Sequence, residues 1–287
     1  MSKPKTKDEI SSHKEQSISN FSAFLDDLIA SDDPNNAKRA DLISYWLKDF
    51  QLYLSQEKAF DAAKIKSYKR GDVVKVNLGF NVGSEQGGLR YAIVLDKDNK
   101  HNSKTITVVP LTSQKEEKKV YERDVLLGRE LYTRLKAKYD SLSEDLAKQI
   151  NECQTNIDQS RQVYEFISIA FADTTKFDPE KTAKMKSDLE DSLARQTERL
   201  TQLQEDTKAL GKINIELHRM KDGSIAKIEQ VTTISKQRIF DPRKNADVLS
   251  GIRFSDTAMD KINEKLKELY IFWLTASILC SIITTFD

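Results

Sequence analysis

The spacing of hydrophobic positions changes along the chain and divides it into helical and strand-forming regions. From Ser19 to Leu54 the spacing is helical, with Phe21, Phe24, Leu25 and Leu28 on one face of the first stretch. The turn-forming sequence SDDPNN separates this stretch from a second amphipathic one. These patterns predict two helices that pack against another part of the protein. The polar residues 1–18 that precede them predict a disordered tail.

From Tyr68 onward the apolar residues alternate with polar ones, as β-strands require. Three segments, YKRGDVVKVNLGF, RYAIVLD and TITVVPL, follow one another closely with glycine-rich connections. The same pattern returns much later, in IAKIEQVTTI. Short, closely spaced strands of this kind are typical of a small barrel, which we expect to be interrupted between its third strand and the returning segment.

The interrupting tract has the pattern of two long helices. In its second half leucines and two polar residues follow each other at alternating spacings of four and three, the seam of a coiled coil: Leu189, Leu193, Gln196, Leu200, Leu203, Thr207 and Leu210. A less regular stripe runs from Leu131 to Tyr164 in the first half. Asp178 followed by Pro179 predicts the start of the second helix. We therefore expect two antiparallel arms, paired weakly because several seam positions are polar.

These patterns together predict an α+β protein with an interrupted barrel. The expected parts are a tail at 1–18, a helical extension at 19–66, the first part of the barrel at 67–128, a coiled-coil insertion at 129–217, and the rest of the barrel with a final helix at 218–287. That helix begins near Ser255 and runs into an uncharged stretch from Tyr270 to Phe286. This stretch falls short of a comfortable membrane span, so we expect it to be buried against protein.

Composition and charge narrow the classes of function. The formal net charge is +1, but basic residues outnumber acidic ones between Lys64 and Lys119, whereas the tract from 130 to 212 is slightly acidic. Cys153 and Cys280 have no metal or redox spacing, and the polar N-terminus has no secretory signal, which favours a cytoplasmic protein. The histidines are scattered and no carboxylate cluster has metal-site spacing, so we expect neither a metal nor another cofactor.

Three segments carry a family resemblance: KRGDVVKVNLGFNVGSEQGGLR, VVPLTSQK and IEQVTTISKQRI. In order and content they resemble the signature segments of the PemK/MazF toxins, RNA-cleaving toxins of bacterial toxin-antitoxin systems. The resemblance covers about residues 66–128 and 218–270 and implies an SH3-like barrel. The arms and the N-terminal helices lie outside it.

The resemblance implies roles for individual residues. Arg90 falls on the family's catalytic arginine and Thr112 on its catalytic threonine, while Ser84, Glu85 and Gln86 fall on the loop that covers the RNA cleft. The residue after the arginine is usually proline in the family and is Tyr91 here. Glu229 and Gln230, in the last segment, are expected to hold the barrel and its dimer surface together.

The chemistry of RNA agrees with these roles. Because RNA carries its own nucleophile in the 2′-hydroxyl, cleavage needs only positioning, a proton acceptor and stabilisation of the phosphorane. Arg90 would stabilise charge on the phosphate, Thr112 would bind a phosphate oxygen, and Glu85 is the nearest plausible base. Lys69, Arg70 and Lys75 would follow the RNA backbone. The alternatives are a structural ion pair for Arg90, a plain strand residue at Thr112 and a solvated loop glutamate at Glu85.

Two functions of different classes follow. The first is a toxin that cleaves single-stranded RNA, acts as a homodimer and is neutralised by a protein antitoxin. The second is a binding module without catalysis, acting by protein or DNA contact as gyrase-poisoning relatives do, with the arms as an interaction platform. The pair of Arg90 and Thr112 favours the first. We also expect that residues 130–212 can be replaced by a short linker without loss of the barrel.

Overall fold

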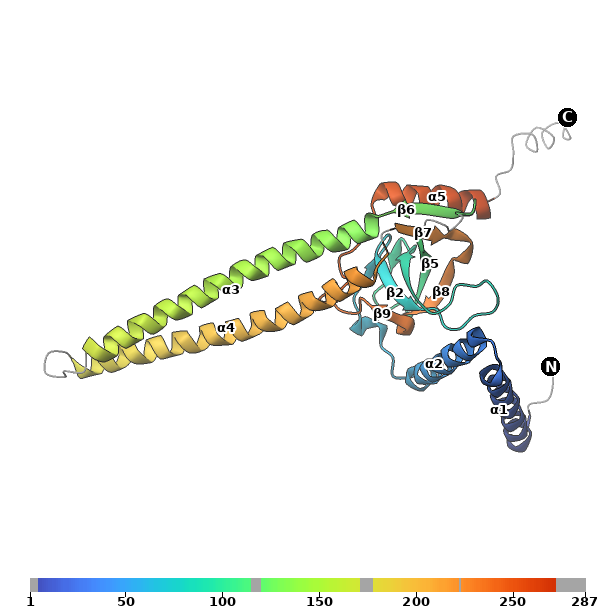
Figure 1. The fold of residues 1–287 in the computed structure, drawn as a ribbon, viewed down its shortest axis with the longest axis horizontal. Helices are drawn as coiled ribbons and strands as arrows, with labels where there is room; N and C mark the ends of the chain where they lie inside the picture. The colour runs from blue at the N-terminus through green and yellow to red at the C-terminus, as the bar shows by residue number, and fades with distance from the viewer. Residues whose placement is uncertain (1–4, 115–119, 171–177, 222, 272–287) are drawn as a thin grey trace, which may run out of the picture.

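Two long helices extend from one side of a small antiparallel sheet, and shorter helices lie on its other sides (Figure 1). The computed structural model describes residues 5–114, 120–170, 178–221 and 223–271. The α-helices are α1 (Lys7–Ala30), α2 (Pro34–Gln56), α3 (Glu130–Ala170), α4 (Pro179–Arg219) and α5 (Asp256–Tyr270). Short 3-10 helices occur at η1 (Ala62–Lys64), η2 (Ile228–Gln230) and η3 (Lys236–Arg238). This mixture of helices and antiparallel strands agrees with the predicted α+β class.

The strands on both sides of the long helices share one sheet. They are β2 (Val73–Asn77), β3 (Leu89–Val94), β5 (Thr105–Gln114), β6 (Asp124–Gly128), β7 (Gly223–Lys227), β8 (Thr232–Ser235) and β9 (Ile239–Asp241). The pairing runs β6-β7-β5-β3-β2-β9, and β8 also pairs with β5. The short strands β1 (Tyr68–Lys69) and β4 (Asp98–Asn99) pair separately. Within the described residues no pairing joins β6 to β9, so closure into a barrel stays a prediction.

Strand β5 organises the sheet because it changes partners along its length. Its residues Thr105 to Val108 pair with β8, Val108 to Pro110 pair with β3, and Leu111 to Gln114 pair with β7. Side chains alternate between the two faces of each strand, and both faces are apolar. One face builds a core with Tyr68 and β8, and the other builds a larger core beneath α5 and the long helices.

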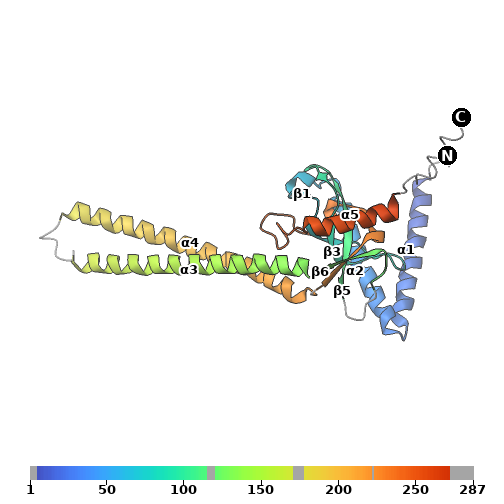
Figure 2. The same cartoon turned by 90° about the horizontal axis from the view of Figure 1, so that it is seen from above.

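The arms, α3 and α4, run antiparallel beside each other (Figure 2). Each has 41 residues, which makes it about 60 Å long at 1.5 Å per residue. Midway along, Cys153, Ile157 and Leu203 form a small buried cluster between the two helices. Asp178 caps α4 and Pro179 occupies its first turn, as the sequence predicts. The interlocked side-chain packing of a coiled coil stays a prediction.

The bases of the arms belong to the core of the sheet, although the predicted boundary at residue 129 falls between β6 and α3. Leu131 and Leu135 are 1% and 0% exposed and lie in the same cluster as Val73 and Ile93 of the strands. Leu217 of α4 joins this cluster as well. The apolar stripe of the helices therefore continues directly into the core. A linker that replaced residues 130–212 would remove part of that core.

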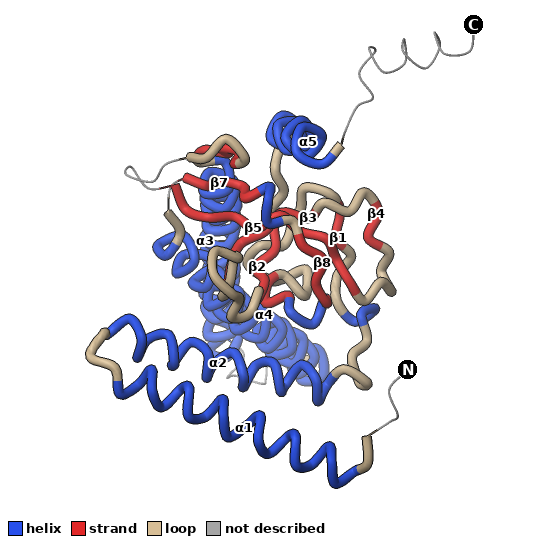
Figure 3. Tube along the Cα trace, turned by 90° about the vertical axis from the view of Figure 1, so that its right-hand side faces the viewer, coloured by secondary structure: helices blue, strands red, loops and turns tan. Residues whose placement is uncertain are grey.

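The N-terminal helices lie along one side of the sheet, and α5 lies on another (Figure 3). The prediction of a disordered tail is wrong for residues 7–18, which are the first half of α1. A capping box begins this helix, because Thr6 accepts a hydrogen bond from Glu9 N and donates its own N–H to the Glu9 carboxylate at 2.7 Å. Helix α1 has no buried residue and packs against α2, whose Ala40 and Ile43 are buried.

Helix α5 begins where the sequence predicts, with Ser255 as its N-cap. Its apolar side enters the larger core through Ala258, Met259 and Ile262. Glu130 at the start of α3 accepts hydrogen bonds from Ser255 N at 2.6 Å and Ser255 Oγ at 3.0 Å, which ties α3 to α5. In the segments that the structure describes, no helix has the length and apolarity needed to cross a membrane. Cys280 and the predicted apolar tail beyond Ile271 lie outside those segments.

Candidate active site

The loop before Arg90 folds back on itself because of its glycines. Gly88 has φ of +75°, a conformation that glycine adopts without strain. At Gly87 a Cβ atom would lie 2.8 Å from the carbonyl oxygen of Gly79, so only glycine fits there. Gly88 N donates to that same carbonyl at 2.7 Å, and Arg90 Nε donates to Gly87 O at 2.9 Å. The loop thus holds Arg90 at the second residue of β3, with its side chain exposed.

Arg90 and Thr112 lie on either side of the point where the sheet divides, and neither of them lines the cavity described below. Ala92 of β3 pairs with Pro110 of β5, and the same register carried two residues further sets Arg90 opposite Thr112. At Leu111, however, β5 has already turned to pair with β7, and Thr112 pairs with Ile225 there. The two side chains therefore flank the point where β5 leaves β3. They share one face of the sheet because each lies two residues from the Ala92–Pro110 pair.

A polar cavity of about 480 Å³ adjoins this point. Glu85 and Gln86 of the loop line one part of it, and Pro110 lines another. The remaining lining includes Glu229, Gln230 and Thr232 from the segment after the arms, with Arg238. Glu85 is exposed, and its carboxylate accepts Val82 N at 3.4 Å. The cavity thus brings the loop, the dividing point of the sheet and the last signature segment together.

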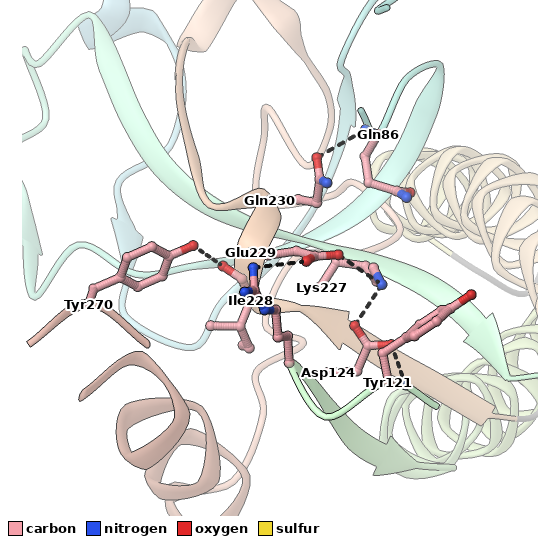
Figure 4. A network of polar contacts seen from close by, with 9 residues as sticks. Gln86, Tyr121, Asp124, Lys227, Ile228, Glu229, Gln230 and Tyr270 are labelled. Atoms are coloured by element: carbon pink, nitrogen blue, oxygen red, sulfur yellow. Dashed lines mark hydrogen bonds and ion pairs between the residues drawn. The ribbon is translucent and has the colours of Figure 1, made fainter. Parts of the chain in front are cut away.

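A chain of polar contacts ties the loop to the body of the sheet (Figure 4). Gln86 N donates to Gln230 Oε1 at 3.2 Å, which connects the loop to η2. Lys227, directly before η2, has its ammonium 2.6 Å from Asp124 Oδ1 and 3.4 Å from Glu229 Oε1. The Lys227 and Asp124 side chains are only 9% and 2% exposed. This buried ion pair therefore positions the short helix that carries Glu229 and Gln230.

The electrostatics of this network favour the charged lysine. Burial disfavours the Lys227 ammonium, but Asp124 and Glu229 outweigh that effect and raise its pKa. The ammonium also lies 5.1 Å from the centre of the Tyr121 ring, a cation–π contact. On the other side of η2, Tyr270 of α5 donates its hydroxyl to Ile228 O at 3.2 Å. Helix α5 therefore supports the same short helix.

Helix α2 supports the other end of the loop. Trp46 packs so closely on Gly79 that a Cβ atom there would lie 2.7 Å from the indole. The guanidinium of Arg238 lies 5.3 Å from the centre of the same ring, and its Nε donates to Asn77 O at 2.7 Å. Asn77 in turn donates to Asp49 of α2 at 2.8 Å. Burial lowers the pKa of Arg238.

Within the described ranges, no three histidine, cysteine, aspartate or glutamate side chains gather as they would around a metal ion. Metal-independent chemistry remains a prediction that only an activity measurement can test.

Much of this site lies in a part of the sequence that matches a known protein family. Residues 69–163 match the model of a family described as PemK-like, MazF-like toxin of type II toxin-antitoxin system. This part of the chain is therefore similar to a PemK/MazF-type toxin domain. No curated protein matches the sequence.

The match to the PemK/MazF family model runs from β1 through most of α3, to residue 163, so it extends past the limit of about 128 expected from the resemblance. It includes Glu85, Arg90 and Thr112, and it confirms the resemblance carried by the first two signature segments. The third segment lies beyond the matched range, but its strand β8 and the strand β7 directly before it both pair with β5 of the matched part. The sheet of the PemK/MazF-type domain therefore receives strands from both sides of the arms.

The basic residues predicted to follow RNA are placed in different surroundings. Lys69 is exposed on β1. Arg70 is half-buried and donates to Leu95 O and to Asn263 of α5, so it holds α5 against the domain. Lys75 lies opposite Tyr91 in the ladder, on the face away from Arg90. Its ammonium lies 2.5 Å from the Glu216 carboxylate of α4. The charges of Arg70 and Lys75 thus serve structural contacts, and their role in following RNA stays a prediction.

Tyr91, the departure from the proline usual in PemK/MazF proteins, has a structural partner in the arms. Its hydroxyl donates to the same Glu216 carboxylate that pairs with Lys75. Burial and the hydrogen bond to Glu216 raise the pKa of Tyr91, which keeps the phenol protonated. The arm α4 therefore contacts β3 at the residue after Arg90. Proline at this position would have no group with which to make that contact.

Sequence reasoning assigned Glu229 and Gln230 to holding the barrel together and did not single out Arg238. The structure places all three in the lining of the cavity. Glu229 and Gln230 lie in the third signature segment, and this position was the sequence signal that could have placed them at the site. For Arg238 the sequence offered no signal beyond its place in the same segment, because the contact with Trp46 joins residues far apart in the chain. Ser84 is exposed in the loop and does not line the cavity.

Proposed function

We propose that the chain is the toxin of a type II toxin-antitoxin system and that it cleaves single-stranded RNA in the cytoplasm without a metal ion. The match of residues 69–163 to the PemK/MazF family model supports this proposal, together with the positions of Arg90 and Thr112, each two residues from the Ala92–Pro110 pair, and a polar cavity lined by Glu85 and Gln86. RNA that is read by sequence is generally unpaired, since its bases must reach the protein. The fixed loop and the cavity suit such a strand.

In the proposed reaction the 2′-hydroxyl of one nucleotide attacks the adjacent phosphorus. Glu85 accepts the proton of that hydroxyl, and the bond from phosphorus to the 5′ oxygen breaks. The 5′ oxygen takes up a proton from water, which leaves a 2′,3′-cyclic phosphate and a 5′-hydroxyl. Arg90 stabilises the charge that develops on the non-bridging oxygens, because its planar donors bind two oxygens at once. Thr112 hydrogen-bonds one of these oxygens, while Ser84, Gln86 and Lys69 contact the strand on either side.

The test is incubation of purified protein with a long RNA in EDTA, followed by mapping of the new ends. We expect cleavage with cyclic phosphate and 5′-hydroxyl ends. Arg90→Ala should lower the rate at least about 100-fold, the usual loss for one preorganised transition-state donor. Arg161→Ala, which changes an exposed arginine far along α3, serves as the matched control and should leave the rate unchanged. Strict dependence on Mg²⁺, or near-normal turnover by Arg90→Ala, would contradict the mechanism.

The proposed partners are an antitoxin protein and a second copy of the chain. Strands β6 and β9 stand at the ends of the pairing path, and uncovered strand edges favour association. A homodimer built on the sheet would cover such edges with closed symmetry. Light scattering at micromolar concentration should report a dimer, and a monomer at that concentration would count against this part of the proposal.

A further inference from the structure

A second cavity lies between α2 and the strand edge near η3, next to the candidate active site. Its volume is about 350 Å³, in the range of small-ligand sites. Four aromatic side chains line it: Trp46, Phe50, Tyr53 and Phe60. The Trp46 and Phe50 ring centres lie 5.6 Å apart and the Trp46 and Tyr53 ring centres 6.2 Å apart, so these three rings form one continuous aromatic surface. Nothing in the proposed cleavage chemistry uses this cavity.

Arg238 connects the two cavities, because it lines both of them. Its hydrogen-bond and ring partners, Asn77 O and Trp46, are neutral. In the part of the chain that the structure describes, no carboxylate forms an ion pair with it. A partly buried cation without a counter-charge is costly, and an anionic group beside it would remove that cost. The position between the cavities therefore suits a phosphate.

We propose that the aromatic cavity binds one unpaired base of the RNA substrate, with Arg238 binding the phosphate that joins this nucleotide to those in the active-site cavity. Stacking on aromatic rings combined with a cation on the backbone is how proteins generally hold single strands. An apolar side chain of a protein partner would fill the rings but leave Arg238 without an anion. The inference rests on the proposed function, because the ligand is part of the same RNA.

This subsite would extend the domain beyond the residues that match the PemK/MazF model. Trp46, Phe50 and Tyr53 belong to α2, which precedes the matched range, and Arg238 follows it. The N-terminal helices would then have a role in substrate binding. Trp46 also packs on Gly79 at the start of the Arg90 loop, so an occupied cavity would lie directly behind that loop.

The test is a fluorescence titration with short, random-sequence 2′-O-methyl oligonucleotides, which lack the nucleophile and cannot be cleaved. The chain has two tryptophans, so Trp273→Phe leaves Trp46 as the reporter. We expect RNA to quench Trp46. Phe50→Ala should weaken binding at least about fivefold, since one stacked base contributes about 1–3 kcal/mol. Phe50 is 45% exposed, so its truncation costs little stability. Tyr45→Ala, which removes a 63% exposed aromatic from the same helix, is the control and should bind normally.

A second variant, Arg238→Gln, tests the phosphate contact independently of the stacked base. Arg238→Gln should lower the slope of log affinity against log salt concentration by about 0.7, the value for one phosphate contact on a single strand. Phe50→Ala should leave that slope unchanged. If the wild type binds and cleaves RNA but neither variant differs from it, the subsite is refuted and the proposed function stands. If RNA quenches Trp46 but is never cleaved, the proposed chemistry fails while the subsite stands. If RNA does not bind at all, both are wrong.

Discussion

Shortening the arms at two different points tests whether their bases are part of the folded domain. The first variant replaces residues 130–212 with a short Gly/Ser linker. The second removes residues 147–202 and joins Leu146 to Leu203 with about six Gly and Ser residues, a length usual between paired helices. Leu146 and Leu203 belong to the same cluster between α3 and α4, so a short linker can span them.

The expected loss of stability follows from the buried residues that each variant removes. The longer replacement deletes Leu131 and Leu135, which are 1% and 0% exposed. Truncating one buried leucine to alanine costs about 2–5 kcal/mol, so losing both costs about 4–10 kcal/mol. It also deletes Lys138, whose ammonium donates to the carbonyls of Val248 and Ser250 at 2.8 Å each. Since a domain is stable by only about 5–15 kcal/mol, this variant should be largely unfolded.

The shorter excision keeps Leu131, Leu135, Lys138 and Glu216 and should fold. Circular dichroism with urea titration measures the stability of both variants, and the EDTA cleavage assay measures their activity. We expect the excised protein to retain RNA cleavage, because the excision leaves the core beneath α5 and the residues of the candidate site in place. A stably folded 130–212 replacement would refute the argument about the core. An excised protein that folds but does not cleave would mean that the outer arms belong to the active enzyme.

Two further predictions concern buried polar groups. Asp124→Ala should lower the free energy of unfolding by about 3–5 kcal/mol, since it leaves the Lys227 ammonium buried without its partner at 2.6 Å. The control is Glu152→Ala. Its ion pair with Lys148 is exposed, with the lysine and glutamate side chains 76% and 62% exposed, so its loss should cost no more than about 1 kcal/mol. Equal losses in urea titrations of the two variants would refute the importance of burial. The pKa of Tyr91 is raised by burial and by Glu216, so the folded state holds the phenolic proton more tightly than the unfolded chain, and stability present below about pH 10 should fall as the pH rises further. Urea midpoints measured between neutral and alkaline pH should fall less steeply for Tyr91→Phe, and an unchanged slope would count against this cause.

The local elements of this protein were determined by the sequence itself. Caps such as Asp178 with Pro179 and Ser255 begin helices where their side chains satisfy free backbone N–H groups, which is a short-range effect. In β2, Val73, Val74 and Val76 place apolar side chains on both faces of the strand. The glycines before Arg90 require a tight loop. The start of α1 was missed because the polar composition of residues 1–18 outweighed the capping pair of Thr6 and Glu9.

Only the tertiary structure decided which distant residues share a site. The change of partners by β5 is a matter of long-range pairing, and it sets Arg90 and Thr112 on either side of the point where the sheet divides. The ion pair between Lys75 and the Glu216 carboxylate is also a long-range contact, and the basic character of Lys75 in the sequence does not predict it. Contacts of this kind depend on which faces pack together. The spacing of apolar residues in the sequence shows that one face of an element is apolar, but it does not show which element packs against that face. That is why the arms looked like a separable insertion, although the first turns of α3 and the last turns of α4 complete the core.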